Sequence, residues 1–111
     1  MKVMKPPLLN RQLTLETPAR LPDGAGGFIE SWQALGTLWG AVQLRSGREA
    51  SGLSQSRFKI TLRAAPEGHS MRPRADQRLV EGPRRYRIDA VHEADPQGRY
   101  LTCFAHEEVV T

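Results

Sequence analysis

The sequence is poor in cysteine, in aromatic residues and in long hydrophobic runs. A single cysteine, Cys103, stands among 111 residues, so no internal disulfide can form, which is typical of a reducing compartment. The opening MKVMKPPLL carries two lysines but no apolar core of a secretory signal, and no stretch approaches membrane-spanning length. These absences predict a soluble protein made in the cytoplasm, without a membrane partner.

Motifs of catalysis and of metal or phosphate binding are missing as well. Neither GxSxG nor HExxH occurs, and no other serine, histidine and aspartate spacing indicates a catalytic site. Cys103 and His106 lie three positions apart, which on a strand sends them to opposite faces, and no second pair completes a zinc site. The glycines of 23–27 and 46–52 neither end in GK[ST] nor precede a helix. We predict no catalytic residue, metal or cofactor, with Cys103 in the core and His106 on the surface.

The composition that remains is that of one small, basic, globular domain. The chain is 39% hydrophobic and 25% charged with a net charge of +4, and its length suits a single domain with a thin core. A basic balance suits nucleic acid or an acidic protein, and equally a solvated surface rich in arginine. Aromatic residues make up only 6% of the chain and stand mostly at core-like positions, which argues against sequence-specific nucleic-acid reading.

Alternation of apolar and polar residues predicts about six or seven short strands. The expected strands are 9–17, 28–33, 37–44, 57–63, 78–82, 84–94 and 99–110. Pro18 should end the first strand or mark a sheet edge, LPDGAGG (21–27) is a turn, and a short break is expected at 34–36. With almost no helix, the pattern predicts an all-β protein, a small β-barrel or sandwich with long protruding loops.

The expected division of the chain is a flexible N-terminal arm, 1–8, and a single barrel domain, 9–111. Two connections are irregular: the proline-rich and arginine-rich segment 64–77, and LRSGREASGLSQSRF (44–58), a soft polar stretch between two strands. Gly47 and Gly52 permit large backbone changes, and four serines keep the second stretch hydrated, so it reads as a long mobile loop.

Six motifs follow one another in order along residues 9–109. They are LNRQLTLE (9–16), DGAGGFIESW (23–32), LWGAVQLRSGREA (38–50), FKITLR (58–63), GPRRYRIDAV (82–91) and RYLTCFAHEEV (99–109). Together they resemble the small head–tail joining proteins of tailed bacteriophages, also called head completion or stopper proteins. Ala25 replaces an aromatic of the family pattern, Leu44-Arg45 replaces its proline, and 64–77 is particular to this chain. The excess of arginine and alanine over lysine also suits a gene transfer agent, a phage-like particle.

The resemblance implies a structural protein of the particle neck, assembled in the bacterial cytoplasm and not an enzyme. Copies would form a dodecameric ring between the portal–adaptor complex and the tail terminator or tail tube, with double-stranded DNA passing through the lumen. The ring would hold packaged DNA and provide the surface on which the tail docks.

The resemblance also assigns candidate sites. The lumen-facing or inter-subunit loop would comprise Arg45, Ser46, Gly47, Arg48, Glu49, Ala50, Ser51, Gly52, Leu53, Ser54, Gln55 and Ser56. Within it, Arg45 and Arg48 would lie near DNA. Separately, the irregularity and expected exposure of 64–77 suggest that its residues Arg72, Arg74 and Asp76 contact partner proteins. The alternatives are a loop without a role, a basic barrel that binds single-stranded nucleic acid, and an adaptor or tail-terminator ring of the same particle.

Overall fold

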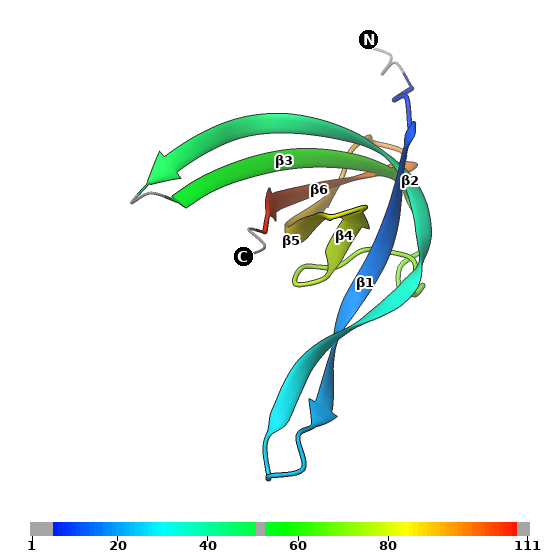
Figure 1. Cartoon of the computed structure of the whole chain (residues 1–111). Helices are drawn as coiled ribbons and strands as arrows, with labels where there is room; N and C mark the ends of the chain where they lie inside the picture. Colours follow the sequence, from blue (N-terminus) through cyan, green and yellow to red (C-terminus); the bar gives the residue numbers. More distant parts are fainter. Residues whose placement is uncertain (1–5, 51–52, 109–111) are drawn as a thin grey trace.

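A computed structural model describes residues 6–50 and 53–108, with the backbone alone at 46–50 and 53–55. Within these residues the chain has no helix and six strands: β1 (Arg11–Pro22), β2 (Phe28–Ala50), β3 (Leu53–Arg63), β4 (Arg78–Glu81), β5 (Arg84–Glu93) and β6 (Tyr100–Glu107). All neighbours are antiparallel and close into a barrel in the order β1-β2-β3-β6-β5-β4 (Figure 1). The predicted all-β class is confirmed.

The two predicted segments 28–33 and 37–44 form one continuous strand, so the break expected at 34–36 is wrong. The pairing of β1 with β2 shifts register between Leu15 and Glu16, which leaves Leu35 as an extra residue on β2. A bulge of this kind bends a strand without ending it. Pro18 does not end β1. It lies where β1 pairs with β2 on one side only, so it marks a sheet edge, which was the second of the two predicted roles.

The stretch 44–58 is a pair of strands and not the soft loop that its composition predicted. β2 continues through Ala50, β3 begins at Leu53, and the two pair from Ser46↔Arg57 to Ala50↔Leu53 after a register shift. A polar stretch can form paired strands because the hydrogen bonds between strands come from the backbone and not from apolar side chains. The barrel strands that lead into the two segments already fix their register. Ser51 and Gly52 lie outside the described residues, as do the side chains of 46–55.

Two hairpins therefore extend beyond the barrel in different directions (Figure 1). One joins β1 to β2 through the turn 23–27, and the other joins β2 to β3. Because of these projections, the molecule measures 59 × 37 × 21 Å along its principal axes. The barrel is thus a compact base from which two ribbons project (Figure 1).

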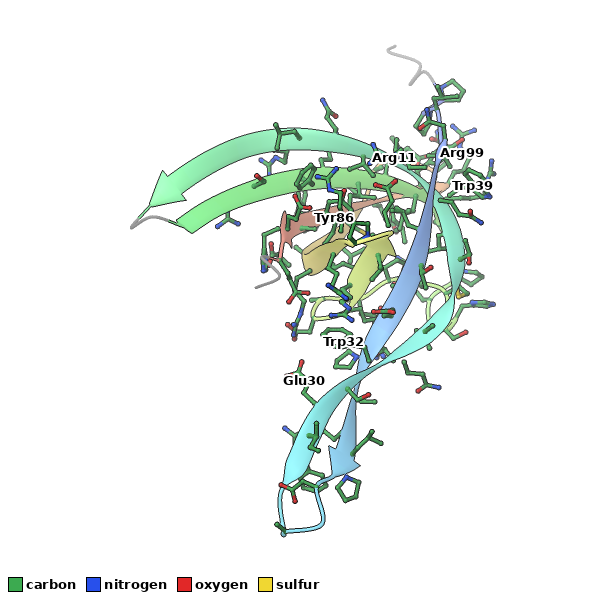
Figure 2. The ribbon with its side chains drawn as sticks, viewed as in Figure 1. Arg11, Glu30, Trp32, Trp39, Tyr86 and Arg99 are labelled. Carbon is green, nitrogen blue, oxygen red and sulfur yellow. The ribbon has the colours of Figure 1, made fainter. Side chains whose placement is uncertain are left out.

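The core lies inside the barrel and follows the predicted alternation. Phe58, Ile60 and Leu62 of β3 are buried. Tyr86 also lies in the core (Figure 2), and its ring packs edge-to-face with the Phe58 ring at a centroid distance of 5.0 Å. The remaining buried apolar residues are Leu13, Leu15, Leu79, Ile88, Leu101, Cys103 and Ala105. Alternation along 84–94 predicts that Tyr86, Ile88 and Ala90 share the inward face. This is wrong for Ala90, because the register shifts after Ile88 and Val91 packs on the core instead.

Gly40 is buried where β2 crosses the core, and its lack of a side chain is required there. A Cβ at this position would lie 2.8 Å from Leu62 Cδ2 and 2.9 Å from Leu13 Cδ1. We expect Gly40→Ala to lower the free energy of unfolding by about 1–3 kcal/mol, because both leucines would have to leave their packed positions. Urea denaturation measures this. Thr37→Ala, on an exposed position of the same strand, is the control, and equal midpoints for the two variants would contradict the packing.

The barrel closes through a short seam between β1 and β4. Only Thr14↔Val80, Leu15↔Leu79 and Glu16↔Arg78 pair across it. Ion pairs stand at both ends: the Arg11 guanidinium binds the Glu81 carboxylate with two hydrogen bonds, and Arg78 Nε lies 2.6 Å from Glu16 Oε1. Since so few backbone bonds close the ring, these pairs help to hold it shut.

The Arg11–Glu81 pair gives the seam a dependence on pH. The hydrogen bonds from Arg11 lower the pKa of the Glu81 carboxyl from its ordinary 4.5. A carboxyl whose folded pKa is lowered contributes stability above its unfolded pKa and loses it as the pH falls through the folded value. We therefore expect Glu81→Gln to cost roughly 1 kcal/mol or less at pH 7, and the cost to vanish well below pH 4.5. Thermal melts at both pH values test this against Glu67→Gln, and a cost that persists in acid would contradict it.

Candidate assembly surfaces

The tip of the β1–β2 hairpin is fixed by an aspartate and two glycines. Asp23 Oδ1 accepts hydrogen bonds from the amides of Ala25 (2.8 Å) and Gly27 (3.0 Å), and these bonds lower the pKa of its carboxyl. Gly24 and Gly26 have φ of 80° and 84°, a region that favours glycine. The sequence DGAGG thus makes the predicted turn, and it makes it rigid.

Below this tip the hairpin exposes large apolar side chains. Leu21 and Ile29 face each other across the ribbon and are 52% and 57% exposed, and Phe28 on the other face is 64% exposed. Apolar residues gathered on a projecting ribbon, outside any core, are typical of a contact surface for another protein. Sequence alternation alone did not reveal them, because it cannot distinguish a ribbon beyond the barrel from one that covers a core.

Trp32 fixes the β1–β2 hairpin to the barrel at its root (Figure 2). The ring is half-buried and lies 4.0 Å from Arg78 Cζ and 5.0 Å from Arg87 Cζ, on β4 and β5 respectively. Arg78 is held in turn by Glu16 of β1. Two cations on one indole ring provide an attraction that a flexible joint would lack, so the direction of the hairpin is set by packing.

The root of the β2–β3 hairpin carries Arg45, which the sequence assigned to DNA. Its guanidinium carbon lies 4.7 Å from the centre of the Phe104 ring on the outside of the barrel. Nearby, Asp89 Oδ1 lies at hydrogen-bond distance, 2.9 Å, from His106 Nδ1. The other carboxylate oxygen of Asp89 lies 4.0 Å from Arg57 Nη1. Arg48 and the rest of the assigned stretch, 46–55, have no described side chains. The structure therefore locates the root of the hairpin and its path, but not its assigned contacts.

The outer face of β2, β3 and β6 is both basic and aromatic. Arg57, Lys59 and Arg63 of β3 are exposed. Trp39 is 55% exposed on the outside of the barrel (Figure 2). The guanidinium carbon of Arg63 lies 5.8 Å from the centre of the Tyr100 ring. The expectation that aromatics stand mostly in the core is thus wrong for Trp39, Phe28 and the half-buried Tyr100. Strand alternation already placed Trp39 opposite Leu38, which was the signal for its exposure.

Segment 64–77 is irregular, as predicted, and is held by hydrogen bonds. The amides of His69 and Arg72 donate to Pro66 O and His69 O at 3.0 Å each, and Arg72 Nη1 donates to Ala65 O at 2.9 Å. Buried Gln77 joins the segment to β5, because Ile88 N–H donates to Gln77 O at 2.9 Å. Segment 64–77 is therefore an ordered loop that forms part of the surface.

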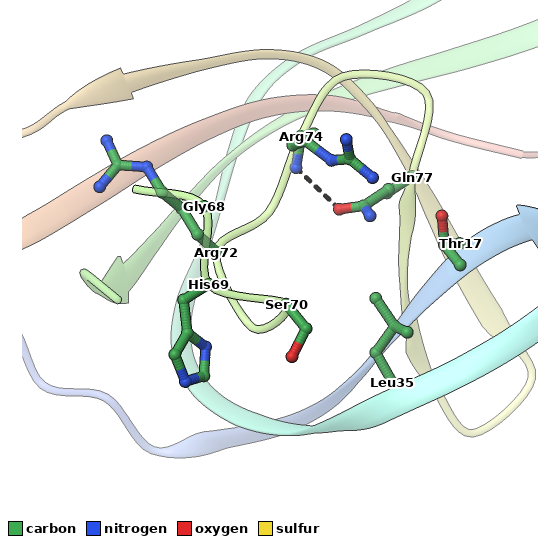
Figure 3. A pocket seen from close by; sticks show the side chains of 8 residues that line it. All are labelled: Thr17, Leu35, Gly68, His69, Ser70, Arg72, Arg74 and Gln77. Carbon is green, nitrogen blue, oxygen red and sulfur yellow. Dashed lines mark hydrogen bonds between the residues drawn. The ribbon is translucent and has the colours of Figure 1, made fainter. Parts of the chain in front are cut away.

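Of the three residues assigned to a partner contact, Arg72 and Arg74 line one pocket, and Asp76 lines a separate concavity. Arg74 lines a pocket of about 270 Å³ between 64–77 and one face of the β1–β2 hairpin (Figure 3). Asp76 lines a wider concavity of about 740 Å³ on the other face of the hairpin, together with Glu30 and Arg87. The Arg72 guanidinium extends away from Leu35, toward the far side of the loop (Figure 3). Segment 64–77 thus offers two separate surfaces.

Cys103 and His106, which the sequence raised as a possible metal pair, do not come together in the structure. Burial raises the pKa of the Cys103 thiol to about 12, so it stays protonated. His106 points outward to Asp89, which confirms the predicted opposite placement of these two residues. No group of three or more histidine, cysteine, aspartate or glutamate side chains gathers within the described residues as metal ligands would.

No helix long and apolar enough to cross a membrane occurs between residues 6 and 108, where the chain is described. The described chain is a closed antiparallel barrel with two projecting hairpins. In a comparison with protein families, residues 4–108 match the model of the phage head completion protein. The chain belongs to the phage head completion protein family and is a structural protein of a phage or phage-like particle.

A solved structure supports the same assignment. A chain from the virion of a native gene transfer agent particle is 49% identical and superposes with a TM-score of 0.83. The match covers 96% of this chain and 100% of the other. Comparison with curated proteins gave no significant match.

Proposed function

We propose that this protein is the stopper of a tailed phage or gene transfer agent, without catalytic activity or cofactor. Its copies form a dodecameric ring between the portal–adaptor complex and the tail terminator or tail tube. The ring retains DNA after packaging and provides the surface on which the tail docks. Membership of the head completion family supports a place at the head, and the likeness to a virion chain supports a place in the finished particle.

The observation that carries the proposal is the β2–β3 hairpin, 45–57, which leaves the barrel as a two-stranded ribbon. A two-stranded ribbon without its own core is marginally stable alone, so it can change position at little cost in free energy. In a ring each ribbon is repeated by symmetry, and weak contacts of Arg45 and Arg48 with DNA phosphates add up. Glu49 limits the positive charge of the ring, and the ribbon contacts its neighbour, the DNA, or both.

Contacts with the head and tail proteins would come from three other regions. They are the N-terminal arm, 1–10, segment 64–77 and the C-terminal stretch, 104–111. The first five residues and 109–111 lie outside the described residues. Imaging of complete particles tests the assignment: density for this chain as a ring in the neck supports it, and a chain found only as a free monomer, absent from particles, would contradict it.

A second candidate function has one observation in its favour. The exposed Trp39 and the arginine-covered Tyr100 stand on a basic outer face, an arrangement that suits single-stranded nucleic acid. Tight binding of an oligonucleotide by the monomer, with a steep loss of affinity as salt rises, would favour this function over the stopper.

A further inference from the structure

The pocket beside the β1–β2 hairpin is lined almost entirely by hydrogen-bond donors. Its polar lining comes from Thr17, His69, Ser70, Arg72, Arg74 and Gln77 (Figure 3). No aspartate or glutamate belongs to this lining, and no carboxylate among the described side chains forms an ion pair with Arg74. A recess with a cation, several donors and no anion is suited to a ligand that brings negative charge and acceptors.

Hydrogen bonds within the loop decide which way the donors point. The Met71 amide donates to His69 Nδ1 at 3.0 Å, so the neutral ring carries its proton on Nε2, where it can donate. The Arg74 amide donates to Gln77 Oε1 at 2.8 Å, which leaves the side-chain NH₂ of Gln77 on the Thr17 side (Figure 3). The loop thus uses the acceptors of these side chains for itself and leaves their donors free.

The size and walls of the pocket limit what can enter. Its volume of about 270 Å³ lies at the lower end of ligand sites, which suits one side chain better than a nucleotide. Leu35 forms an apolar wall, and an apolar wall strengthens a charge-assisted hydrogen bond by excluding water. A DNA phosphate sits on a convex, stiff duplex and is usually met by projecting side chains, so it fits this recess poorly.

We propose that this pocket binds the carboxylate of an acidic side chain from a neighbouring protein of the particle. Arg74 supplies the charge, and the hydroxyl groups of Thr17 and Ser70 with the Gln77 amide complete the donor set. The site rests on the proposed function, because it needs a neighbour in the neck. It gives segment 64–77 a defined contact. Arg72 also lines the pocket, but its Nη1 already donates a hydrogen bond to Ala65 O.

The ligand chemistry is tested on the whole chain by NMR titration with acetate and, separately, with inorganic phosphate, at constant ionic strength. Acetate should shift the Gln77 side-chain amide and the Ser70 amide in a saturable way. Arg74→Gln should weaken this binding by about tenfold or more, through loss of the charged donor. Arg63→Gln, the same change on the outer face of β3, should leave it unchanged. Phosphate binding without acetate binding, or equal binding by both variants, would overturn the proposal.

The source of the carboxylate is tested in particles made with Arg74→Glu and, as control, Arg63→Glu. Arg74→Glu should reduce complete particles by about tenfold or more, and lysine at an acidic residue of a neighbouring protein should restore them. Normal assembly of Arg74→Glu particles, or complete particles that only lose DNA, would overturn the pocket. A wild-type particle without this chain in its neck would instead contradict the stopper function, so the two failures are distinguishable.

Discussion

Removing residues 47–54 is expected to leave the barrel folded and to let packaged DNA escape from the particle. The deletion joins Ser46 to Gln55, and because Ser46 pairs with Arg57, it leaves a two-residue connection between paired strands. Gln55→Asn with Ser56→Gly then gives the Asn-Gly sequence that such a connection favours. The barrel strands keep their register and the core is untouched, so the melting temperature should barely change.

The effect on the particle should be large because the ribbon is repeated around the ring. If each copy contributes a weak contact with DNA or with its neighbour, losing all of them together should reduce delivered DNA by about 10²-fold or more. The measurement is DNA content of heads and gene delivery per particle. A control deletion at the other projecting turn, 24–26, should leave DNA retention intact. Particles that keep their DNA without residues 47–54 would contradict a role of the ribbon in retention.

Trp32→Ala is expected to free the β1–β2 hairpin and to destabilise the protein by about 2–4 kcal/mol. The indole ring is half-buried between Arg78 and Arg87, and its removal leaves both guanidinium groups without their stacking surface. Hydrogen exchange should accelerate in the part of the hairpin beyond the barrel, 17–33, more than in β3 and β6. Urea denaturation gives the loss of stability.

The matched control is Trp39→Ala, which removes the same side chain from the outside of the barrel. Trp39 is 55% exposed, so its loss should change stability by only about 0.5 kcal/mol. Equal losses for the two tryptophans, or unchanged exchange in the hairpin of Trp32→Ala, would show that Trp32 does not fix the hairpin.

Much of the barrel was predictable because strand alternation reports which face is buried. Leu13, Leu15 and the three apolar residues of 58–62 point inward as the pattern required. Alternation cannot report bulges, and this is why the break at 34–36 and the inward place of Ala90 were wrong. At each bulge one extra residue in the strand reverses which side chains face the core. A single extra residue of this kind cannot be recognised from the hydrophobic pattern.

The candidate surfaces were less predictable because they depend on positions far apart in the sequence. Small polar residues suggested a loop at 44–58, yet strand pairing that starts in the barrel continues through most of it. Arg72, Arg74 and Asp76 stand close in sequence, but Arg72 and Arg74 line one pocket while Asp76 lines a separate concavity. The contact of Arg78 and Arg87 with the Trp32 ring joins side chains from three strands, and no local sequence pattern reveals such a contact.

A map of the intact particle at residue resolution tests the central claim most directly. The stopper function predicts a ring of this chain between the portal–adaptor complex and the tail, with the 45–57 ribbons directed into the DNA channel. The separate proposal for the Arg74 pocket predicts an acidic side chain of a neighbouring protein there. A neck without this chain, or a ring whose ribbons point away from the channel and contact neither DNA nor a neighbouring copy, would contradict the stopper function.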